Sequence, residues 1–125
     1  EADEIDRINI LRATHAAMRR AVDALSPAAD AVIVDGLAVP DLHDVCVPLV
    51  RGDSLCAAVG AASIVAKVTR DRLMQGYDRT WPGYGFAGHK GYPSPSHREA
   101  LARLGPCPIH RRTFGPVAQQ ALDFG

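Results

Sequence analysis

AVIVDG, at residues 31–36, is a short apolar run that ends in an aspartate and a glycine. Such a run predicts a buried strand that carries the Asp35 carboxylate at its C-terminal end. Residues 45–50, VCVPLV, predict a second strand, which Pro48 restricts to a sheet edge or a bulge because proline cannot donate a ladder hydrogen bond. Asp53 follows three residues later. The two runs therefore predict a sheet with an aspartate beyond each strand.

Long helices are predicted on both sides of these strands. Residues 4–25 place apolar side chains at spacings of three, four or seven, which indicates an amphipathic helix, and Ser26 and Pro27 end it. Residues 57–77 predict a second helix. We expect its small residues to pack closely on the sheet and its polar residues to form a stripe at spacings of four and three. These residues are Ala61, Ala62 and Ala66, and Ser63, Lys67 and Arg70.

The segment at residues 81–114 has a different composition. It combines glycine, proline, tyrosine, tryptophan and histidine with five Lys or Arg residues. Gly and Pro interrupt helices and strands, and rings among cations suit stacking on bases and contact with phosphates. Inside it, Ser94 or Ser96 begins a third predicted helix that ends near Leu104. A last short helix is expected at residues 116–122. The composition of this segment points to nucleic acid.

The totals limit the class of protein. A chain of 125 residues, 47% hydrophobic, fits one domain, residues 1–125. No apolar run is long enough to span a membrane, and no signal sequence opens the chain. The cysteines are odd in number and lack CxxC spacing, so we expect neither a disulfide framework nor a zinc site, and a reduced cytoplasmic setting. Only two strands are predicted, whereas a helix-flanked sheet usually has more, so we expect further strands upstream of residue 1.

The net charge of zero hides two unlike halves. Residues 1–53 hold ten Asp or Glu and five Arg, a balance of −5, while residues 54–125 hold four acids and nine Lys or Arg, a balance of +5. A basic half suits a polyanion, and acids in the other half suit cations. Ordinary surface charge is the alternative interpretation of the same distribution.

Two groups of side chains are candidates for chemistry. Asp35 and Asp53, meeting at strand ends, could hold Mg²⁺ or Mn²⁺, which prefer oxygen ligands and can activate water. Alternatively, Asp35 is a turn former and Asp53 a helix cap.

In the second group, Lys90 could bind a phosphate, Tyr92 could contact a ribose, and His89 lies beside them. The alternative for this group is a polar surface loop. Trp81 and Phe86 are expected to anchor the loop by packing, and Cys107 to be structural.

Several longer strings resemble bacterial ribonuclease H type II, and they cover nearly the whole chain in order. The matching segments are EIDRINILRAT at residues 4–14, VDG at 34–36, RGD at 51–53, AASIVAKVTRDRLM at 61–74, PGYGFAGHKGY at 82–92 and LGPCPIHRRTF at 104–114.

The resemblance implies a ribonuclease-H-like α/β fold, here partial and with a helix-rich C-terminal portion. It implies metal-dependent hydrolysis of the RNA strand of RNA–DNA hybrids. The cut is expected on the 5′ side of ribonucleotides embedded in DNA. Two of the four family acids fall on Asp35 and Asp53, with Mg²⁺ or Mn²⁺ as cofactor. Tyr92 matches the residue that senses the ribose 2′-hydroxyl. The candidate substrate-binding residues are Tyr92, Lys90, His89, Lys67 and Ser63.

The chain also departs from the family pattern. The N-terminal Asp-Glu pair with its glycine-arginine motif is absent, and Asp3 and Glu4 do not replace it because they begin the first helix. Leu55 stands where a basic residue is usual, and Ala58 where a polar one is common. We therefore expect this chain alone to be inactive or nearly so. The alternatives are a non-catalytic module that binds RNA–DNA hybrids, or one half of an assembly that self-associates, although full-length relatives are expected to be monomeric.

Overall fold

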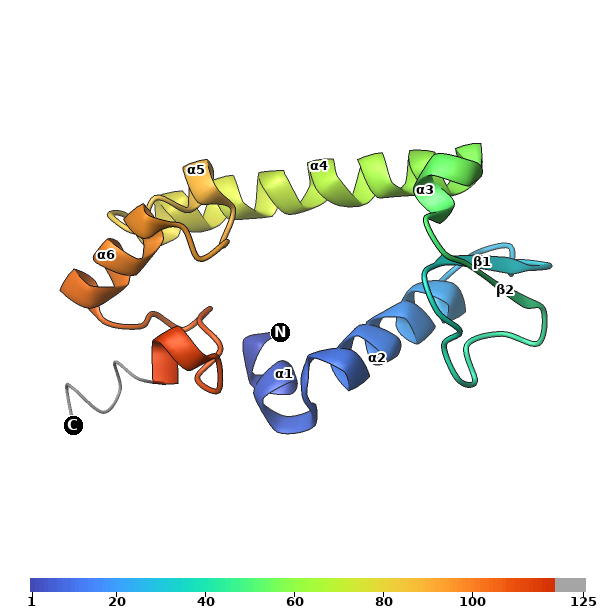
Figure 1. The fold of residues 1–125 in the computed structure, drawn as a ribbon, viewed down its shortest axis with the longest axis horizontal. Helices are drawn as coiled ribbons and strands as arrows, with labels where there is room; N and C mark the ends of the chain where they lie inside the picture. The colour runs from blue at the N-terminus through green and yellow to red at the C-terminus, as the bar shows by residue number, and fades with distance from the viewer. Residues whose placement is uncertain (119–125) are drawn as a thin grey trace. The chain divides into compact units, whose positions relative to one another are not determined.

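The computed structural model describes residues 1–118, which divide into two units (Figure 1). One unit is continuous and comprises Ile8–Ala66. The other joins Glu1–Arg7 to the described residues from Lys67 onward. Mostly helices and one small parallel sheet make up a mixed α/β structure, as the sequence predicts. Within residues 1–118, no helix is both long and apolar enough to cross a bilayer.

The sheet lies in the unit of residues 8–66 and has two strands. β1 (Val32–Asp35) pairs in parallel with β2 (Cys46–Leu49), which confirms both predicted strands. The prediction that the first strand is buried is wrong for most of its length, because only Val34 of β1 is buried and Ile33 is 44% exposed. Pro48 pairs opposite Val34 and is tolerated because each strand of a two-stranded sheet has an unpaired edge. A small core forms around buried Val34, with Val39, Leu42, Met18 and Val22 packed against it.

The N-terminal helix is interrupted. The chain forms α1 (Ala2–Ile8) and α2 (Ile10–Asp23), so the prediction of one helix over residues 4–25 is wrong at Asn9. Asn9 takes a positive φ of 66° with ψ of 166°, a non-helical backbone conformation that separates α1 from α2. Its side-chain oxygen accepts a hydrogen bond of 3.1 Å from the Arg12 N–H and so caps α2. The apolar periodicity continues on both sides of Asn9. The sequence pattern therefore gave no sign of the break.

The second long helix is confirmed. α3 (Gly52–Leu55) precedes α4 (Ala57–Thr80), which extends three residues beyond its predicted end. The prediction that Ala61, Ala62 and Ala66 pack on a sheet is wrong for the described chain, where all three are exposed. The sheet has only two strands, and β1 is in contact with the short α3. The apolar side chains of this stretch of α4 are exposed as well.

We predict that these exposed apolar side chains make the isolated chain self-associate. Ile64 and Val65 on α4 are each 66% exposed, and contiguous apolar surface and open strand edges favour association. The 13.3 kDa chain is therefore expected to scatter light as a dimer or larger species at micromolar concentration, and Ile64→Lys with Val65→Lys to shift it toward monomer. Gln75→Lys, an exposed polar position on the same helix, is the control. A monomeric mass for the unmodified chain would contradict the prediction.

The other unit is built around Phe86. α5 (Phe86–His89) and α6 (Pro95–Leu104) follow α4, and Phe86 is only 2% exposed in a cluster with Tyr84, Ala100 and Cys107. Trp81 packs against this cluster, which confirms both predicted loop anchors. The start of α6 is also confirmed, because the Ser94 hydroxyl accepts a hydrogen bond of 3.2 Å from the His97 N–H. Residues 115–118 are helical, and the remainder of the helix predicted at 116–122 lies outside the described residues.

Asp6 joins the two ends of this unit. Its carboxylate accepts hydrogen bonds from the Arg112 N–H at 2.7 Å, the Thr113 N–H at 3.0 Å and the Thr113 hydroxyl at 2.5 Å. The bond from the Thr113 hydroxyl is the main reason why the pKa of Asp6 is lowered, and the two backbone N–H groups act in the same direction.

We predict that the contribution of Asp6 to stability is lost in acid. A carboxyl group with a lowered pKa in the folded state stabilises the fold above its ordinary pKa of 3.8, and the effect disappears as the pH falls through the folded pKa. Asp6→Asn should therefore lower the urea midpoint at pH 7 and have little effect near pH 3. Asp3→Asn, at an exposed position on the same helix, should change neither midpoint. An equal effect of Asp6→Asn at both pH values would contradict the prediction.

Candidate functional site

The first part of the candidate site is the acidic edge of the sheet. Asp35 is the last residue of β1, and its Oδ1 accepts a hydrogen bond of 2.8 Å from the Gly52 N–H. Gly52 begins α3, and Asp53 is the next residue. The Gly36 N–H also donates to the Leu49 carbonyl at 3.0 Å, which holds the ends of the two strands together. The structure therefore brings Asp35 next to the segment that carries Asp53, at the carboxyl edge of the parallel pair.

Gly52 lies at the turn from β2 into α3. The preceding Arg51 has a left-handed backbone with φ of 58°, which turns the chain from β2 into α3. A Cβ atom at position 52 would be close only to Val59 Cγ1, at 3.3 Å, while its distance of 3.5 Å to the Asp35 carboxylate oxygen is an ordinary contact. The position of Asp35 against the start of α3 therefore rests on its hydrogen bond to the Gly52 N–H.

The donor set at this edge fits one hydrated hard cation. Asp35 and Asp53 are both exposed, and one oxygen of each accepts a protein hydrogen bond, from Gly52 and from the Ser54 hydroxyl at 3.3 Å. Each carboxylate therefore retains a second oxygen for a ligand. Among residues 1–118, no three His, Cys, Asp or Glu side chains group around a common point. Two carboxylates suit a single Mg²⁺ or Mn²⁺ that keeps several waters, and they are too few to hold two ions.

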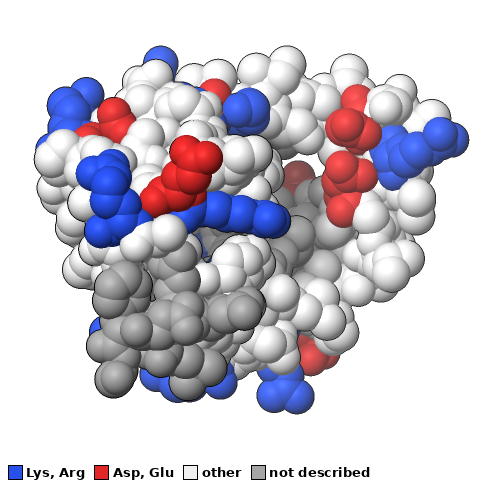
Figure 2. All heavy atoms as spheres, turned by 60° about the vertical axis from the view of Figure 1, so that its left-hand side comes forward, with Lys and Arg blue, Asp and Glu red and all other residues white. Residues whose placement is uncertain are grey.

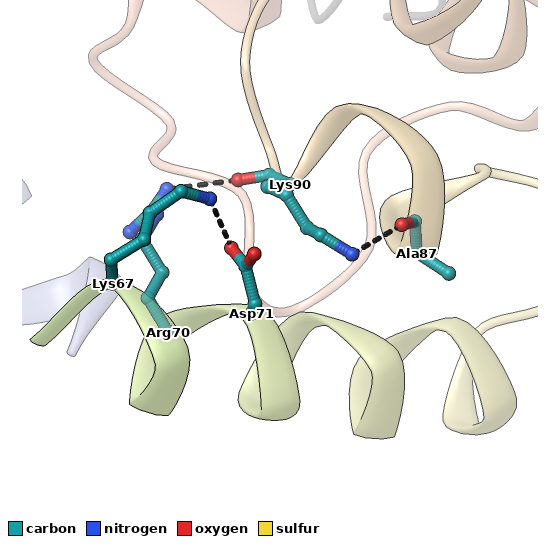
Figure 3. Close-up of polar contacts among 5 residues, drawn as sticks. All are labelled: Lys67, Arg70, Asp71, Ala87 and Lys90. Atoms are coloured by element: carbon teal, nitrogen blue, oxygen red, sulfur yellow. Dashed lines mark hydrogen bonds and ion pairs between the residues drawn. The ribbon is translucent and has the colours of Figure 1, made fainter. Parts of the chain in front are cut away.

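The second part of the candidate site is the loop at residues 84–92 with the adjoining stretch of α4 (Figure 3). The Lys67 ammonium forms an ion pair of 2.6 Å with Asp71, and this bond is the main reason why the pKa of Asp71 is lowered. The Arg70 guanidinium donates to the Lys90 carbonyl at 3.0 Å. The Lys90 ammonium donates to the carbonyl of Ala87 in its own loop. Both lysines among the predicted substrate-binding residues thus have intramolecular partners.

Tyr92 presents its ring to solvent from a fixed backbone. The side chain is 61% exposed, and the Arg70 guanidinium carbon lies 5.7 Å from the ring centroid. The Tyr92 N–H donates to the His89 carbonyl at 2.9 Å, and the Tyr92 carbonyl lies 2.9 Å from His97 Nδ1. The preceding Gly91 has φ of 81°, which favours glycine in this turn.

The contacts of the histidine rings in this unit are the main feature that the sequence did not indicate. His89 Nε2 lies 2.8 Å from the Tyr84 carbonyl, and His89 Nδ1 accepts a hydrogen bond of 3.1 Å from the Gly91 N–H. As a substrate contact His89 therefore stays a prediction, while its ring nitrogens already bind the loop. His97 is 9% exposed, and burial lowers its pKa. No periodicity marks these histidines, so only their number in a Gly- and Pro-rich segment hinted at a shared role.

The seven predicted site residues divide between the units. Asp35, Asp53 and Ser63 belong to the unit of residues 8–66, and Ser63 is exposed on α4; Lys67, His89, Lys90 and Tyr92 belong to the other unit. On the face that Figure 2 draws, Lys and Arg side chains are interspersed with Asp and Glu side chains and do not form one uninterrupted basic patch. The affinity of the basic half for a polyanion therefore stays a prediction.

A comparison with families of known proteins gives one match. The family model described as Ribonuclease HII matches residues 1–117, which is nearly the whole chain of 125 residues. The matched region includes Asp35 and Asp53, the loop at residues 84–92 and the histidines of that unit. This agrees with the resemblance that the sequence strings suggest.

Proposed function

Because the chain belongs to the ribonuclease HII family, a family of ribonucleases that act on RNA–DNA hybrids, we propose that it hydrolyses the RNA strand of such hybrids. We propose that it cuts on the 5′ side of ribonucleotides embedded in DNA. In this reaction water adds to phosphorus and the bond to the preceding 3′ oxygen breaks, leaving a 3′-hydroxyl and a 5′-phosphate. The observation that carries the proposal is the hydrogen bond from Gly52 to Asp35, which keeps Asp35 and Asp53 at one strand edge inside the family match. Residues 1–125 are taken to act as one domain of this family.

Asp35 and Asp53 are the proposed metal ligands. When bound there, Mg²⁺ or Mn²⁺ would activate water and stabilise the leaving oxygen. The Gly52 N–H orients the Asp35 carboxylate through the 2.8 Å hydrogen bond, so one of its oxygens stays directed to the protein and the other is available. With two carboxylates in place of four, the ion is held less firmly, and we propose that the chain alone is a weak enzyme.

The loop at residues 84–92 is the proposed grip on the substrate. The Tyr92 phenol is exposed and can hydrogen-bond a ribose 2′-hydroxyl, the group that distinguishes RNA from DNA at a single position. Lys67 and Lys90 would exchange their partners, Asp71 and the Ala87 carbonyl, for phosphate oxygens. Ser63 and His89 complete the proposed set of substrate contacts.

One observation favours a second candidate function. Among the described residues the acidic edge offers two ligands, whereas the loop that carries Tyr92 is fully tied by its own hydrogen bonds. A chain whose substrate-binding loop is formed, but whose metal site has too few ligands, would bind RNA–DNA hybrids without cutting them. The alternative is therefore a non-catalytic hybrid-binding module.

The decisive experiment uses an end-labelled DNA duplex with one internal ribonucleotide, incubated with excess chain in Mg²⁺ and then in Mn²⁺. We expect slow cleavage 5′ to the ribonucleotide, absent with Asp35→Asn and retained with Asp44→Asn, which alters an exposed acid of the same unit. Binding without cleavage would favour the hybrid-binding module. Neither binding nor cleavage by the folded chain would contradict both functions, and turnover equal to that of a full-length relative would contradict the weak-enzyme proposal.

A further inference from the structure

Three histidines lie together beneath the loop that carries Tyr92. The rings of His89 and His97 stack with centroids 4.1 Å apart and an interplanar angle of 9°, and His97 Nε2 lies 3.2 Å from His110 Nε2. Phe86 packs against all three rings, with centroid distances of 5.6 to 5.7 Å. The three imidazoles therefore form one cluster, and the acidic edge of the sheet is not part of it.

Backbone groups determine where the protons of His89 reside. The Tyr84 carbonyl can only accept, so His89 Nε2, 2.8 Å away, must carry a proton. The Gly91 N–H can only donate, so His89 Nδ1, which accepts it at 3.1 Å, must carry none. His89 is therefore neutral in this arrangement, and its ring connects the start of the loop to Gly91.

The same reasoning determines the protons of His97 and His110. The Tyr92 carbonyl requires a proton on His97 Nδ1, 2.9 Å away. The Cys107 N–H donates to His110 Nδ1 at 3.0 Å, so the proton of His110 lies on Nε2 and is donated to an unprotonated His97 Nε2. The Cys107 carbonyl also lies near His110 Nδ1, but at the longer distance of 3.3 Å. The result is a directed chain of hydrogen bonds from Cys107 through His110 and His97 to the Tyr92 carbonyl.

An added proton disturbs the hydrogen bonds of this cluster. On His89 Nδ1 it would oppose the Gly91 N–H, and on His97 Nε2 it would oppose the His110 N–H. On His110 Nδ1 it would oppose the Cys107 N–H at 3.0 Å, and the Cys107 carbonyl at 3.3 Å is the acceptor that remains. Each of these protonations replaces a hydrogen bond with two facing donors, in a place where unsatisfied polar groups are costly. The loop geometry therefore depends on neutral imidazoles.

The other titratable groups that face the cluster keep their charge state over the relevant pH range. The Cys107 sulfur lies 3.1 Å from His110 Nδ1, and the Tyr84 ring lies 5.2 Å from the His110 ring while its hydroxyl donates to the Gly105 carbonyl at 2.7 Å. Burial raises the pKa of both the Cys107 thiol and the Tyr84 phenol. Burial also lowers the pKa of His97 and of His110, and the neighbouring imidazoles act in the same direction on these two. Of the side-chain types in this cluster, only imidazole has an ordinary pKa between pH 5 and 8.

We propose that His89, His97 and His110 form a positioning latch, which holds the backbone on both sides of Gly91 and keeps Tyr92 in its substrate-binding position only while all three imidazoles are neutral. The role of the latch in binding rests on the proposed function, in which Tyr92 contacts the ribose 2′-hydroxyl. The latch itself is a property of the loop and can be observed without nucleic acid.

The latch makes the pH dependence of binding opposite in sign to that of an ordinary histidine contact. Protonated histidines on a nucleic-acid surface add positive charge and strengthen binding as the pH falls. In the latch, protonation of His89 opposes the Gly91 N–H and protonation of His97 opposes the bond from His110, so recognition of the ribonucleotide weakens as the pH falls. The sign of the effect therefore distinguishes a positioning role from direct contact of His89 with phosphate.

The first arm of the test is free of nucleic acid. Long-range ¹H–¹⁵N NMR at pH 7.5 should show protons on Nε2 of His89 and His110 and on Nδ1 of His97, and the amides of Gly91 and Tyr92 should shift on acidification together with the His97 ring. A different tautomer pattern would overturn the latch. So would amide signals of Gly91 and Tyr92 that do not shift during the titration. Trp81 is the single tryptophan and packs on the cluster around Phe86, so its fluorescence shows whether this unit is still folded at each pH.

The second arm measures affinity by fluorescence anisotropy in EDTA at constant ionic strength. The probes are a DNA duplex with one ribonucleotide and the same duplex of DNA alone. The preference for the ribonucleotide should fall about threefold to tenfold between pH 7.5 and 5.5, as expected for the loss of a hydrogen bond. A preference that is unchanged or stronger at pH 5.5 overturns the latch as a determinant of binding. If NMR shows the latch but the chain has no preference for the ribonucleotide at any pH, the proposed role of Tyr92 in binding is overturned instead.

Variants separate the latch from general effects of histidine. In His97→Asn the side-chain amide can still donate to the Tyr92 carbonyl but does not titrate, so the preference should persist at pH 7.5 and depend less on pH. His89→Gln, which keeps a donor for the Tyr84 carbonyl, is a second non-titrating variant in case the buried position 97 does not tolerate change. His15→Gln, in the other unit, should leave the pH profile as it is. Loss of the pH dependence in His15→Gln would overturn the proposal.

Discussion

Phe86→Ala is expected to lower the free energy of unfolding of its unit by about 3–5 kcal/mol, the usual range for a buried phenylalanine. Phe86 is 2% exposed and stacks on Tyr84, with ring centroids 5.2 Å apart and an interplanar angle of 14°. It also meets His89 and His97 edge-on, at interplanar angles of 76° and 79°. Its removal leaves a cavity beneath the loop and removes the surface on which the histidines rest.

Denaturant unfolding followed by the fluorescence of Trp81 measures this loss. Phe86→Leu keeps most of the volume and should cost less than the alanine variant. Phe114→Ala is the matched control, because Phe114 is 36% exposed and its ring faces Arg111 at 4.7 Å, a contact worth at most about 1 kcal/mol. If Phe86→Ala and Phe114→Ala cost the same, Phe86 is not the centre of this unit.

The second large effect concerns the acidic edge. We expect Asp35→Asn to weaken binding of Mn²⁺ about tenfold or more, and Asp35→Asn with Asp53→Asn to abolish it. Removing one unit charge near a cation costs about 1–4 kcal/mol at the effective dielectric constants of a protein surface, and each 1.4 kcal/mol is a tenfold change in affinity. The amide retains a neutral oxygen and can still face the Gly52 N–H, so the local fold should persist.

Water-proton relaxation or calorimetric titration with Mn²⁺ alone gives the affinity without any requirement for activity. Asp41→Asn with Asp44→Asn is the matched control, since both residues are exposed acids of the same unit and neither lies at the carboxyl end of a strand. An equal loss of affinity in this control would mean that the unit attracts cations only through its general negative charge. One ion per chain is the stoichiometry that two carboxylates support.

The elements that the sequence predicted well are those in which one local signal determines the outcome. The apolar run before Asp35 and the run at residues 45–50 predicted both strands, and Pro48 predicted an edge position for the second one. Ser94 followed by Pro95 predicted the start of α6, because a hydroxyl cap and a proline in the first turn act within a few residues.

The sequence failed where a local choice competes with a periodic pattern. Asn9 sits in an apolar repeat that continues on both sides, so its capping role was hidden. α5 is a single turn between Gly85 and Lys90, both with positive φ, and a turn this short has no periodicity. The tautomers of His89, His97 and His110 depend on carbonyl and N–H groups that only the folded loop brings into reach. The pair of acids was predictable as residues, but their orientation by Gly52 was not.

The bonds of Asp6 have a consequence for how the chain is made. They join residues 106 and 107 positions apart, so the unit that contains them cannot close until Arg112 and Thr113 have emerged from the ribosome. The unit of residues 8–66 is continuous and can form while the remainder is still being synthesised. During translation α1 is therefore complete long before the residues that bind Asp6 have been synthesised. A polypeptide interrupted before Arg112 would keep the acidic edge but leave Asp6 without these hydrogen bonds.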